Sequence, residues 1–305
     1  MVVYVCSLIF SLHTHKELFR GAPQEEAGYD IICDAKTHKF AVKRVGKGIE
    51  IIENCGGNVE NIIGNIEAFF QEKIEKVPDG IYRAEGIVEQ MKGKEDVVIK
   101  AAVEVKGSDI IVDLDGSSPQ VDWGGNVVYN FTYAYVHMAV KSMFDPYIPN
   151  NDGCARPITL KIPEGTVVNC KFPAAVAARM QIGHFMTEII YRALAKAVPD
   201  QVIAASGGTP ATMNVFYGRR KDGKPWHSVI IRGGGMGASA SADGHYVSIF
   251  PANGANTPVE IFESDTPLLV EKRELMADSG GAGKMKGGLG RREVLRIPDD
   301  EYAPM

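Results

Sequence analysis

The stretch VVIKAAVEVKGSDIIVD, residues 97–113, indicates the fold class of this chain. Its first half alternates apolar residues at every second position, which is typical of a strand with one buried face. The alternating residues are Val97, Ile99, Ala101, Val103 and Val105. The turn residues KGSD then lead into a second apolar run, so we predict an antiparallel hairpin.

Further short strands are predicted after this hairpin, separated by turns that contain glycine or proline. They are ITLKI (158–162), TVVNC (166–170), MNVFY (213–217), HSVIIR (227–232) and YVSIF (246–250). Because the strands follow one another through short turns, we expect antiparallel pairing rather than a doubly wound parallel sheet.

Three segments have apolar residues at helical spacing. We predict a helical region over residues 30–76, a buried helix over 126–144 and an amphipathic helix over 182–197. Together with the hairpins, they predict an α+β fold with mixed, largely antiparallel sheets and packed helices. We divide the chain into a helical N-terminal segment, residues 1–80, and an α+β core, residues 81–305.

Composition excludes several classes of protein. The 305 residues have a formal charge of −5 and scattered Lys and Arg, which argues against nucleic-acid binding. The apolar start MVVYVCSLIF is too short to cross a bilayer, and no other apolar run approaches the ~20 residues required, so we expect no membrane association. Five widely spaced cysteines form no C-x-x-C pair, which favours reduced thiols in the cytoplasm.

The glycine-rich run DSGGAGKMKGGLGRRE, residues 278–293, is close to a phosphate-binding loop without matching one. A P-loop requires Ser or Thr after Gly-Lys, and here Met285 follows Lys284. The dinucleotide fingerprint fails as well, because Lys286 stands where its third glycine should be. The run is therefore not a standard nucleotide loop, and from these residues alone both a phosphate-binding role and a simple turn stay open.

A second glycine-rich run, RGGGMGASASADG (232–244), resembles a nucleophile elbow. The motif fails because Ser241 occupies the position of its closing glycine. We favour the interpretation that Gly233–Gly235 allow two backbone segments to approach closely or form a bulge. The alternative is a group of backbone amides that binds an anion.

Two further segments have candidate chemistry. In NNDGC (150–154), Asp152 is a candidate ligand or base, although Asn-Asp-Gly is also typical of a turn, which we favour. Cys154 could act as a nucleophile only with a partnered base, which the sequence does not identify. His184, at the start of the amphipathic helix, faces either a pocket or the core.

Late carboxylates form a further candidate group. Paired carboxylates can do acid–base work, but we favour the interpretation that these are solvated carboxylates at strand ends. They are Glu260, Glu263, Asp265 and Asp278. The seven histidines form neither H-E-x-x-H nor a Cys/His ligand cluster. No single motif therefore assigns the function.

The order of six motifs along the chain is more specific. They are PDGIY (78–82), PNNDGCARPI (149–158), IPEGTVVNCKFPAAVAAR (162–179), GGGMGA (233–238), ANGANTPVEIFE (252–263) and DSGGAGKMKGGLGRRE (278–293). From about residue 25 onward, the chain resembles the hydantoinase B/oxoprolinase family. That family includes N-methylhydantoinase B subunits, the C-terminal part of 5-oxoprolinase, and subunits of caprolactamase and of acetone and acetophenone carboxylases.

The resemblance implies a subunit of an ATP-dependent hydrolase of cyclic amides such as hydantoins, 5-oxoproline or lactams. A hydantoinase A-like partner would bind ATP with magnesium and phosphorylate the carbonyl oxygen of the substrate, in a cytoplasmic hetero-oligomer. The alternatives are a related ATP-dependent ketone carboxylase and a non-catalytic fragment that retains only the assembly surface. A self-sufficient hydrolase that uses Cys154 ranks last.

The resemblance also implies a divalent metal, held by histidines and aspartates in a long N-terminal region of the family. We find no counterpart of that region here, so we assign no metal ligand in this chain. We expect the chain to correspond to the later portion of such a subunit, either as a truncated subunit or as a fragment.

Within this family interpretation we predict three catalytic residues. Asp152 or His184 would be the acid–base group, and Arg179 would orient an anion through its forked donors. The predicted substrate-binding residues are Asn150, Asn151, Gly234, Gly235, Glu260 and Asp278. Because the resemblance places the ATP site on the partner, we predict that the run 278–293 forms tight backbone turns at the interface or active-site wall. The predicted contacts with the partner or the phosphorylated intermediate are Lys284, Lys286 and Arg291.

Overall fold

The computed structural model describes most of the chain after residue 27. The described residues are 28–34, 39–45, 59–89, 95–146, 148, 150–207, 212–220, 222–252, 254 and 256–297. The chain divides into two units, residues 1–65 and 66–305.

The first unit contains an antiparallel strand pair, β1 (Gly28–Asp34) and β2 (Lys39–Val45). The predicted helical region over 30–76 is therefore wrong over these strands. β-branched and aromatic residues are frequent in both, including Ile31, Ile32 and Val42, and such residues favour pleated backbone. The helical spacing applies only to the later part of that range, where helix α2 (Val59–Ile74) forms.

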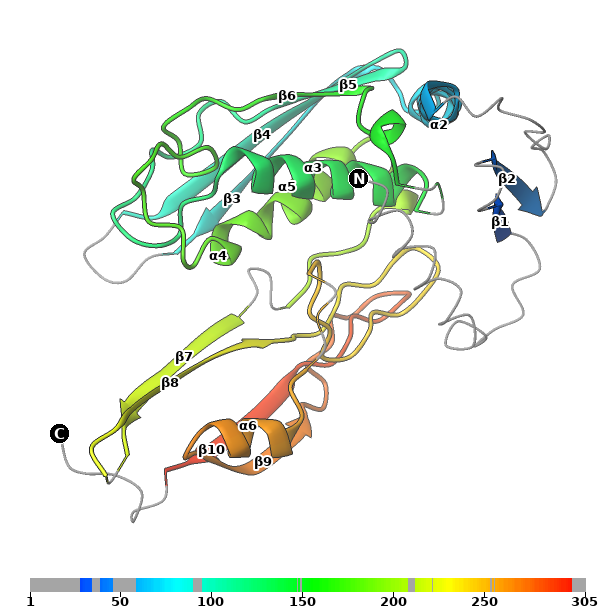
Figure 1. Cartoon of the computed structure of the whole chain (residues 1–305). Coiled ribbons are helices and arrows are strands. Elements are labelled where there is room, and N and C mark those ends of the chain that lie inside the picture. Colours follow the sequence, from blue (N-terminus) through cyan, green and yellow to red (C-terminus); the bar gives the residue numbers. More distant parts are fainter. Residues whose placement is uncertain are drawn as a thin grey trace. The chain divides into compact units, whose positions relative to one another are not determined.

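The main sheet of the second unit has four strands in the order β3-β4-β5-β6 (Figure 1). Strands β3 (Gly80–Val88), β4 (Val97–Lys106) and β5 (Asp109–Asp113) are antiparallel neighbours. The predicted hairpin is thus confirmed. Strand β6 (Ile158–Lys161) pairs with β5 in parallel because the chain returns to the sheet after a long crossover.

That crossover contains helix α3 (Tyr129–Phe144), which confirms the predicted buried helix. The helix ends at Asp145, whose backbone is extended, because a residue before proline disfavours the helical region. The amphipathic helix is also confirmed, as α4 (Met180–Gly183) and α5 (Phe185–Leu194), interrupted for one residue at His184.

Helices α3 and α5 pack against each other, and α5 also contacts β3 and β4 (Figure 1). Their buried side chains meet those of the sheet in one apolar layer. Its fully buried members include Ile99, Val103, Ile189, Ile190 and Leu194. Burial of a side chain of this size stabilises a fold by roughly 1.5–3 kcal/mol, so this layer is the main source of stability in the unit.

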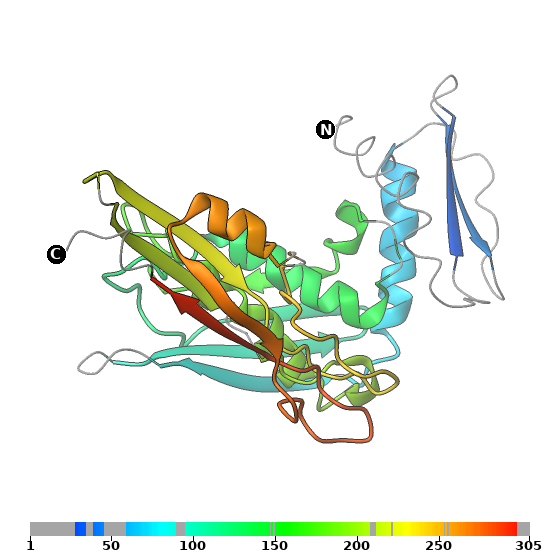
Figure 2. The ribbon, with the colours of Figure 1, turned by 90° about the horizontal axis from the view of Figure 1, so that it is seen from below.

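The C-terminal part of the second unit consists of two antiparallel ribbons and one short helix (Figures 1 and 2). One ribbon pairs β7 (Thr212–Arg219) with β8 (Pro225–Arg232), as predicted. The other pairs β9 (Leu269–Leu275) with β10 (Arg291–Arg296), and helix α6 (Val259–Asp265) lies against β9.

Two predicted strands do not form. TVVNC (166–170) and YVSIF (246–250) make only isolated bridges, although Val167, Val168 and Ile249 are buried. In the first segment, Thr166 and Asn169 bridge each other across a tight turn. In the second, Val247 has a φ of 48°, which a strand does not allow. The residue types in both segments favour β structure, but local turns interrupt the backbone and prevent a continuous strand.

The fold class is α+β, with mixed and largely antiparallel sheets, as predicted. None of the helices in the described part of the chain has the length and apolar character needed to span a membrane. Two single-turn 3-10 helices, Asp152–Cys154 and Pro199–Gln201, complete the secondary structure of these residues.

Candidate functional site

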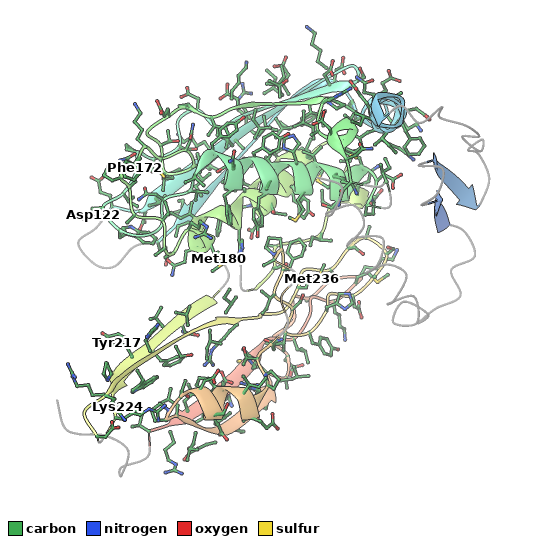
Figure 3. The ribbon with its side chains drawn as sticks, in the orientation of Figure 1. Asp122, Phe172, Met180, Tyr217, Lys224 and Met236 are labelled. Carbon is green, nitrogen blue, oxygen red and sulfur yellow. The ribbon has the colours of Figure 1, made fainter. Side chains whose placement is uncertain are left out.

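The two glycine-rich runs lie far apart in sequence and come together in the structure. The amide of Gly288 donates to the carbonyl oxygen of Met236 at 2.8 Å. The amide of Gly244 donates to the carbonyl oxygen of Lys286, also at 2.8 Å. Met236 is labelled among the C-terminal loops in Figure 3. Together with Ala204, Ala205, Gly207 and Met276, the runs line a cavity of about 580 Å³, which we call the glycine cavity.

Glycine is required where the walls of this cavity cross. A Cβ atom on Gly235 would overlap the carbonyl oxygen of Gly288, and one on Gly237 would overlap that of Ala204. A Cβ on Gly288 would likewise overlap the carbonyl oxygen of His245. The predicted close approach of two backbone segments is therefore confirmed, and it explains why side chains are absent at these positions.

Charged side chains form one end of the glycine cavity, where Arg232, Arg291 and Glu293 are among the lining residues. The Glu293 carboxylate, 5% exposed, forms an ion pair with Arg232 through one oxygen. Its other oxygen accepts from Arg273 Nε at 2.6 Å. The guanidinium of Arg291 donates to the side-chain oxygen of Asn256 at 3.1 Å.

This arrangement pairs two guanidinium groups with one carboxylate and places a third, that of Arg291, near enough for the positive charges to act on one another. Burial, followed by the charges of Arg291 and Arg273, lowers the pKa of Arg232 to about 10. Burial and the charge of Arg273 also lower the pKa of Arg291. Both shifts have the same two physical causes: burial disfavours the charged guanidinium, and neighbouring guanidinium groups repel it.

The glycine cavity contains some of the predicted site residues. Gly234 and Gly235 line it, as does Arg291. Glu260 and Asp278 do not: Glu260 is exposed on α6, and Asp278 is exposed in a turn with a φ of 57°.

The two predicted lysines of the glycine run also lie outside the lining. The side chains of Lys284 and Lys286 are exposed. Only the backbone of Lys286 is fixed, because its amide donates to Asp243 Oδ1 at 2.7 Å. Exposure leaves both ammonium groups accessible to a partner, so their predicted role stays a prediction.

A different group of predicted residues gathers around the 3-10 turn at Asp152. Asn151 caps this turn by accepting from the amide of Gly153 at 2.8 Å, and Asp152 pairs with Arg156 at 2.9 Å. These contacts confirm the favoured turn interpretation of NNDGC. Asn150 and Asn151 also line a second cavity of about 360 Å³, beside Cys154.

Cys154 does not have the environment of a nucleophile. Its side chain is buried, and burial raises the pKa of the thiol. A catalytic cysteine requires the opposite shift, because the thiolate is the reactive species. The geometry therefore argues against the Cys154 hydrolase.

His184 lies in the interior, with 1% of its surface exposed. Its ring packs against Tyr135 and Phe131, with centroids 5.0 and 6.1 Å apart, and burial lowers its pKa to about 4. Arg179 is close to this group, since its guanidinium lies 5.7 Å from the centre of the Phe131 ring. Neither His184 nor Arg179 lines either cavity, so the structure does not bring them together with Gly234 and Gly235.

Residues 48–303 match the family described as hydantoinase B/oxoprolinase. This match covers well over half of the chain. The chain belongs to the hydantoinase B/oxoprolinase family. A relative from Pseudomonas sp. (strain NS671), named as the putative B subunit of a D-/L-hydantoinase, is 33% identical over 286 residues, which are 87% of this chain and 48% of the relative.

Two solved structures are similar in fold to this hydantoinase B/oxoprolinase chain. The ATP-dependent caprolactamase from Pseudomonas jessenii aligns with a TM-score of 0.69 and 24% identity, over 81% of this chain and 44% of the other. A nucleotide-free acetone carboxylase aligns with a TM-score of 0.67 and 19% identity, over 80% and 36%. The chain thus spans about half or less of the length of the proteins it matches.

The described residues do not fit the divalent metal implied by the family. No group of three or more His, Cys, Asp or Glu side chains among them converges in a way that could hold a metal ion. No step is therefore assigned to a metal within this part of the chain, and ATP remains an expectation for the partner.

Sequence reasoning missed Arg232, Arg273 and Glu293. A signal was present for two of them, since Arg232 begins the glycine-rich run 232–244 and Glu293 ends the run 278–293. Arg273 could be found only from the pairing of β9 with β10, which places it opposite Glu293.

Proposed function

We propose that this chain is a subunit of an ATP-dependent hydrolase of cyclic amides, acting with a hydantoinase A-like subunit that binds ATP. The observation that carries the proposal is the family match over residues 48–303. The 33% identical relative, named as the B subunit of a D-/L-hydantoinase, supports the substrate class. Both this name and that of caprolactamase concern ring amides.

The division of labour follows from the chemistry of the substrate. An unstrained amide is a poor electrophile until its carbonyl oxygen is phosphorylated, a reaction that depends on positioning and charge stabilisation. Water then adds to the activated carbon and the ring C–N bond breaks, with the nitrogen leaving as an amine. A second water hydrolyses the resulting acyl phosphate to carboxylate and phosphate.

The geometry of this chain is compatible with ATP binding on the partner. Its glycine-rich runs use amides such as those of Gly244 and Gly288 to bind protein carbonyls. Those amides are not directed at a phosphate chain, unlike the amides of a nucleotide loop. The cytoplasmic location and the hetero-oligomeric state remain predictions.

The proposal is tested by substrate-dependent ADP release from the chain mixed with its purified A-type partner. Hydantoins, 5-oxoproline and lactams are compared with ketones plus bicarbonate. We expect ADP and a ring-opened product only when both proteins and a cyclic amide are present. A carboxylated ketone as the product would instead identify a carboxylase, and no turnover from a complex shown by size-exclusion chromatography would identify an assembly module.

A further inference from the structure

The charged end of the glycine cavity contains more positive than negative side chains. Arg232, Arg273 and Arg291 lie close together there, and within the described part of the chain the carboxylate of Glu293 pairs with Arg232 and Arg273 but not with Arg291. Arg232 has 14% of its side chain exposed, so its charge is largely removed from water. A buried charge is costly unless it is paired, which makes a surplus of guanidinium groups at a cavity wall informative.

The hydrogen-bond donors of the three arginines are not equally used. Arg273 is committed to the protein, because it binds Glu293 and also donates to the carbonyl oxygen of Thr257 at 2.8 Å. Arg291 makes one neutral hydrogen bond, to Asn256, and no described carboxylate lies within ion-pair distance of it. The Nε of Arg232 is buried and has no acceptor among the described residues.

Backbone donors are available on the same cavity. Gly281 and Ala282 line it, and among the described residues their amides donate to no acceptor. The glycine walls also let a ligand approach the main chain without contacting side chains. Forked guanidinium donors combined with backbone amides match the planar or tetrahedral oxygens of an anion.

We infer that the glycine cavity binds a small oxyanion of the phosphate or carboxylate class, held by Arg291 and Arg232. Arg273 positions Glu293, which in turn orients Arg232 toward the cavity. Anion binding of this kind involves this chain alone and requires neither ATP nor a partner, so it can be tested independently of the proposed function.

Isothermal titration of the full chain with inorganic phosphate, and separately with acetate, tests the inference and distinguishes the two chemistries. We expect saturable binding of at least one anion, and the tighter one identifies the class. Arg291→Gln removes a charge-assisted hydrogen-bond donor and should weaken binding about 10- to 100-fold. Arg291→Lys, which keeps the charge without the fork, should weaken it less.

Arg292→Gln is the matched control, because Arg292 is adjacent on β10, 57% exposed and paired with Glu274. The affinity of this variant for the anion should equal that of the unsubstituted chain. Circular dichroism shows whether each variant is folded, and Arg291→Lys keeps the test decisive if Arg291→Gln unfolds. Absence of binding by the unsubstituted chain, or equal weakening by the substitutions at 291 and 292, would overturn the inference.

Discussion

The apolar layer between α3, α5 and the main sheet differs from the glycine cavity in what fills it. In the layer, large side chains such as Ile190 and Leu194 interlock and exclude water. In the cavity, backbone segments cross at Gly235 and Gly288, leaving a hollow edged by guanidinium groups. One region obtains its stability from side-chain volume, whereas the other depends on side chains being absent.

This difference predicts that the two regions respond in opposite ways to the size of a substituted residue. The layer should lose stability when side chains are shortened, and the cavity should lose it when they are lengthened. Two substitutions test that comparison and a third prediction tests how the apolar layer responds to acid, from the largest expected effect to the smallest.

Leu194→Ala should have the largest effect, because Leu194 is fully buried in the apolar layer. A loss of about 2–5 kcal/mol in the free energy of unfolding is expected from lost burial and the cavity left behind. Urea denaturation followed by circular dichroism measures it. Leu275, which is 47% exposed on β9, supplies the control, and Leu275→Ala should change the stability by less than about 0.5 kcal/mol. Equal losses in the two variants would contradict the contrast.

His184 should make the apolar layer sensitive to acid. Its folded pKa of about 4 lies below the ordinary value of 6.5, so the unfolded chain takes up a proton that the folded chain does not. The stability gained from the neutral ring is present above pH 6.5 and is lost as the pH falls toward 4. The loss in the free energy of unfolding should reach about 3 kcal/mol.

Urea denaturation at a series of pH values from 7 to about 4 measures this dependence. In His184→Gln the part of the pH dependence of the free energy of unfolding that His184 causes should disappear, even though the variant is less stable at every pH. An unchanged slope in the variant would show that other groups cause the acid sensitivity.

Gly235→Ala should destabilise the glycine cavity, because the added Cβ overlaps the carbonyl oxygen of Gly288. Overpacking of this kind typically costs about 1–3 kcal/mol. Gly281→Ala is the control on the same cavity, since nothing lies within 4 Å of a Cβ at that position. Denaturation of both variants measures the difference, and a neutral Gly235→Ala would show that the walls can move apart.

The apolar layer was largely predictable from the sequence, because its pattern is local. The alternation from Val97 to Val105 predicted a strand of the sheet, and apolar residues at helical spacing predicted α3 and α5. The incorrect predictions were also local. The predicted helical region 30–76 extended too far toward the N-terminus and included the residues that form β1 and β2. The strand predicted over the apolar segment 246–250 does not form, because the backbone of Val247 has a turn conformation that a strand does not allow.

The glycine cavity was predictable only in part. The close approach of backbones at Gly233–Gly235 followed from residue type, because only glycine lacks the Cβ that such an approach excludes. The segment that approaches it could not be inferred, since Met236 and Gly288 are separated by about fifty residues and no periodicity links them. The ion-paired cluster around Glu293 depends on the same distant contacts.

The crossing of the two glycine runs also bears on the order of folding. Hairpins such as β4–β5 join residues that are near in sequence and close short loops, so we expect them to form early. The contacts between residues 235–238, 244–247 and 286–289 close longer loops, which include helix α6 and strand β9. The oxyanion site should therefore be the last part of this unit to assemble, and a chain released before residue 286 would contain the apolar layer but no binding cavity.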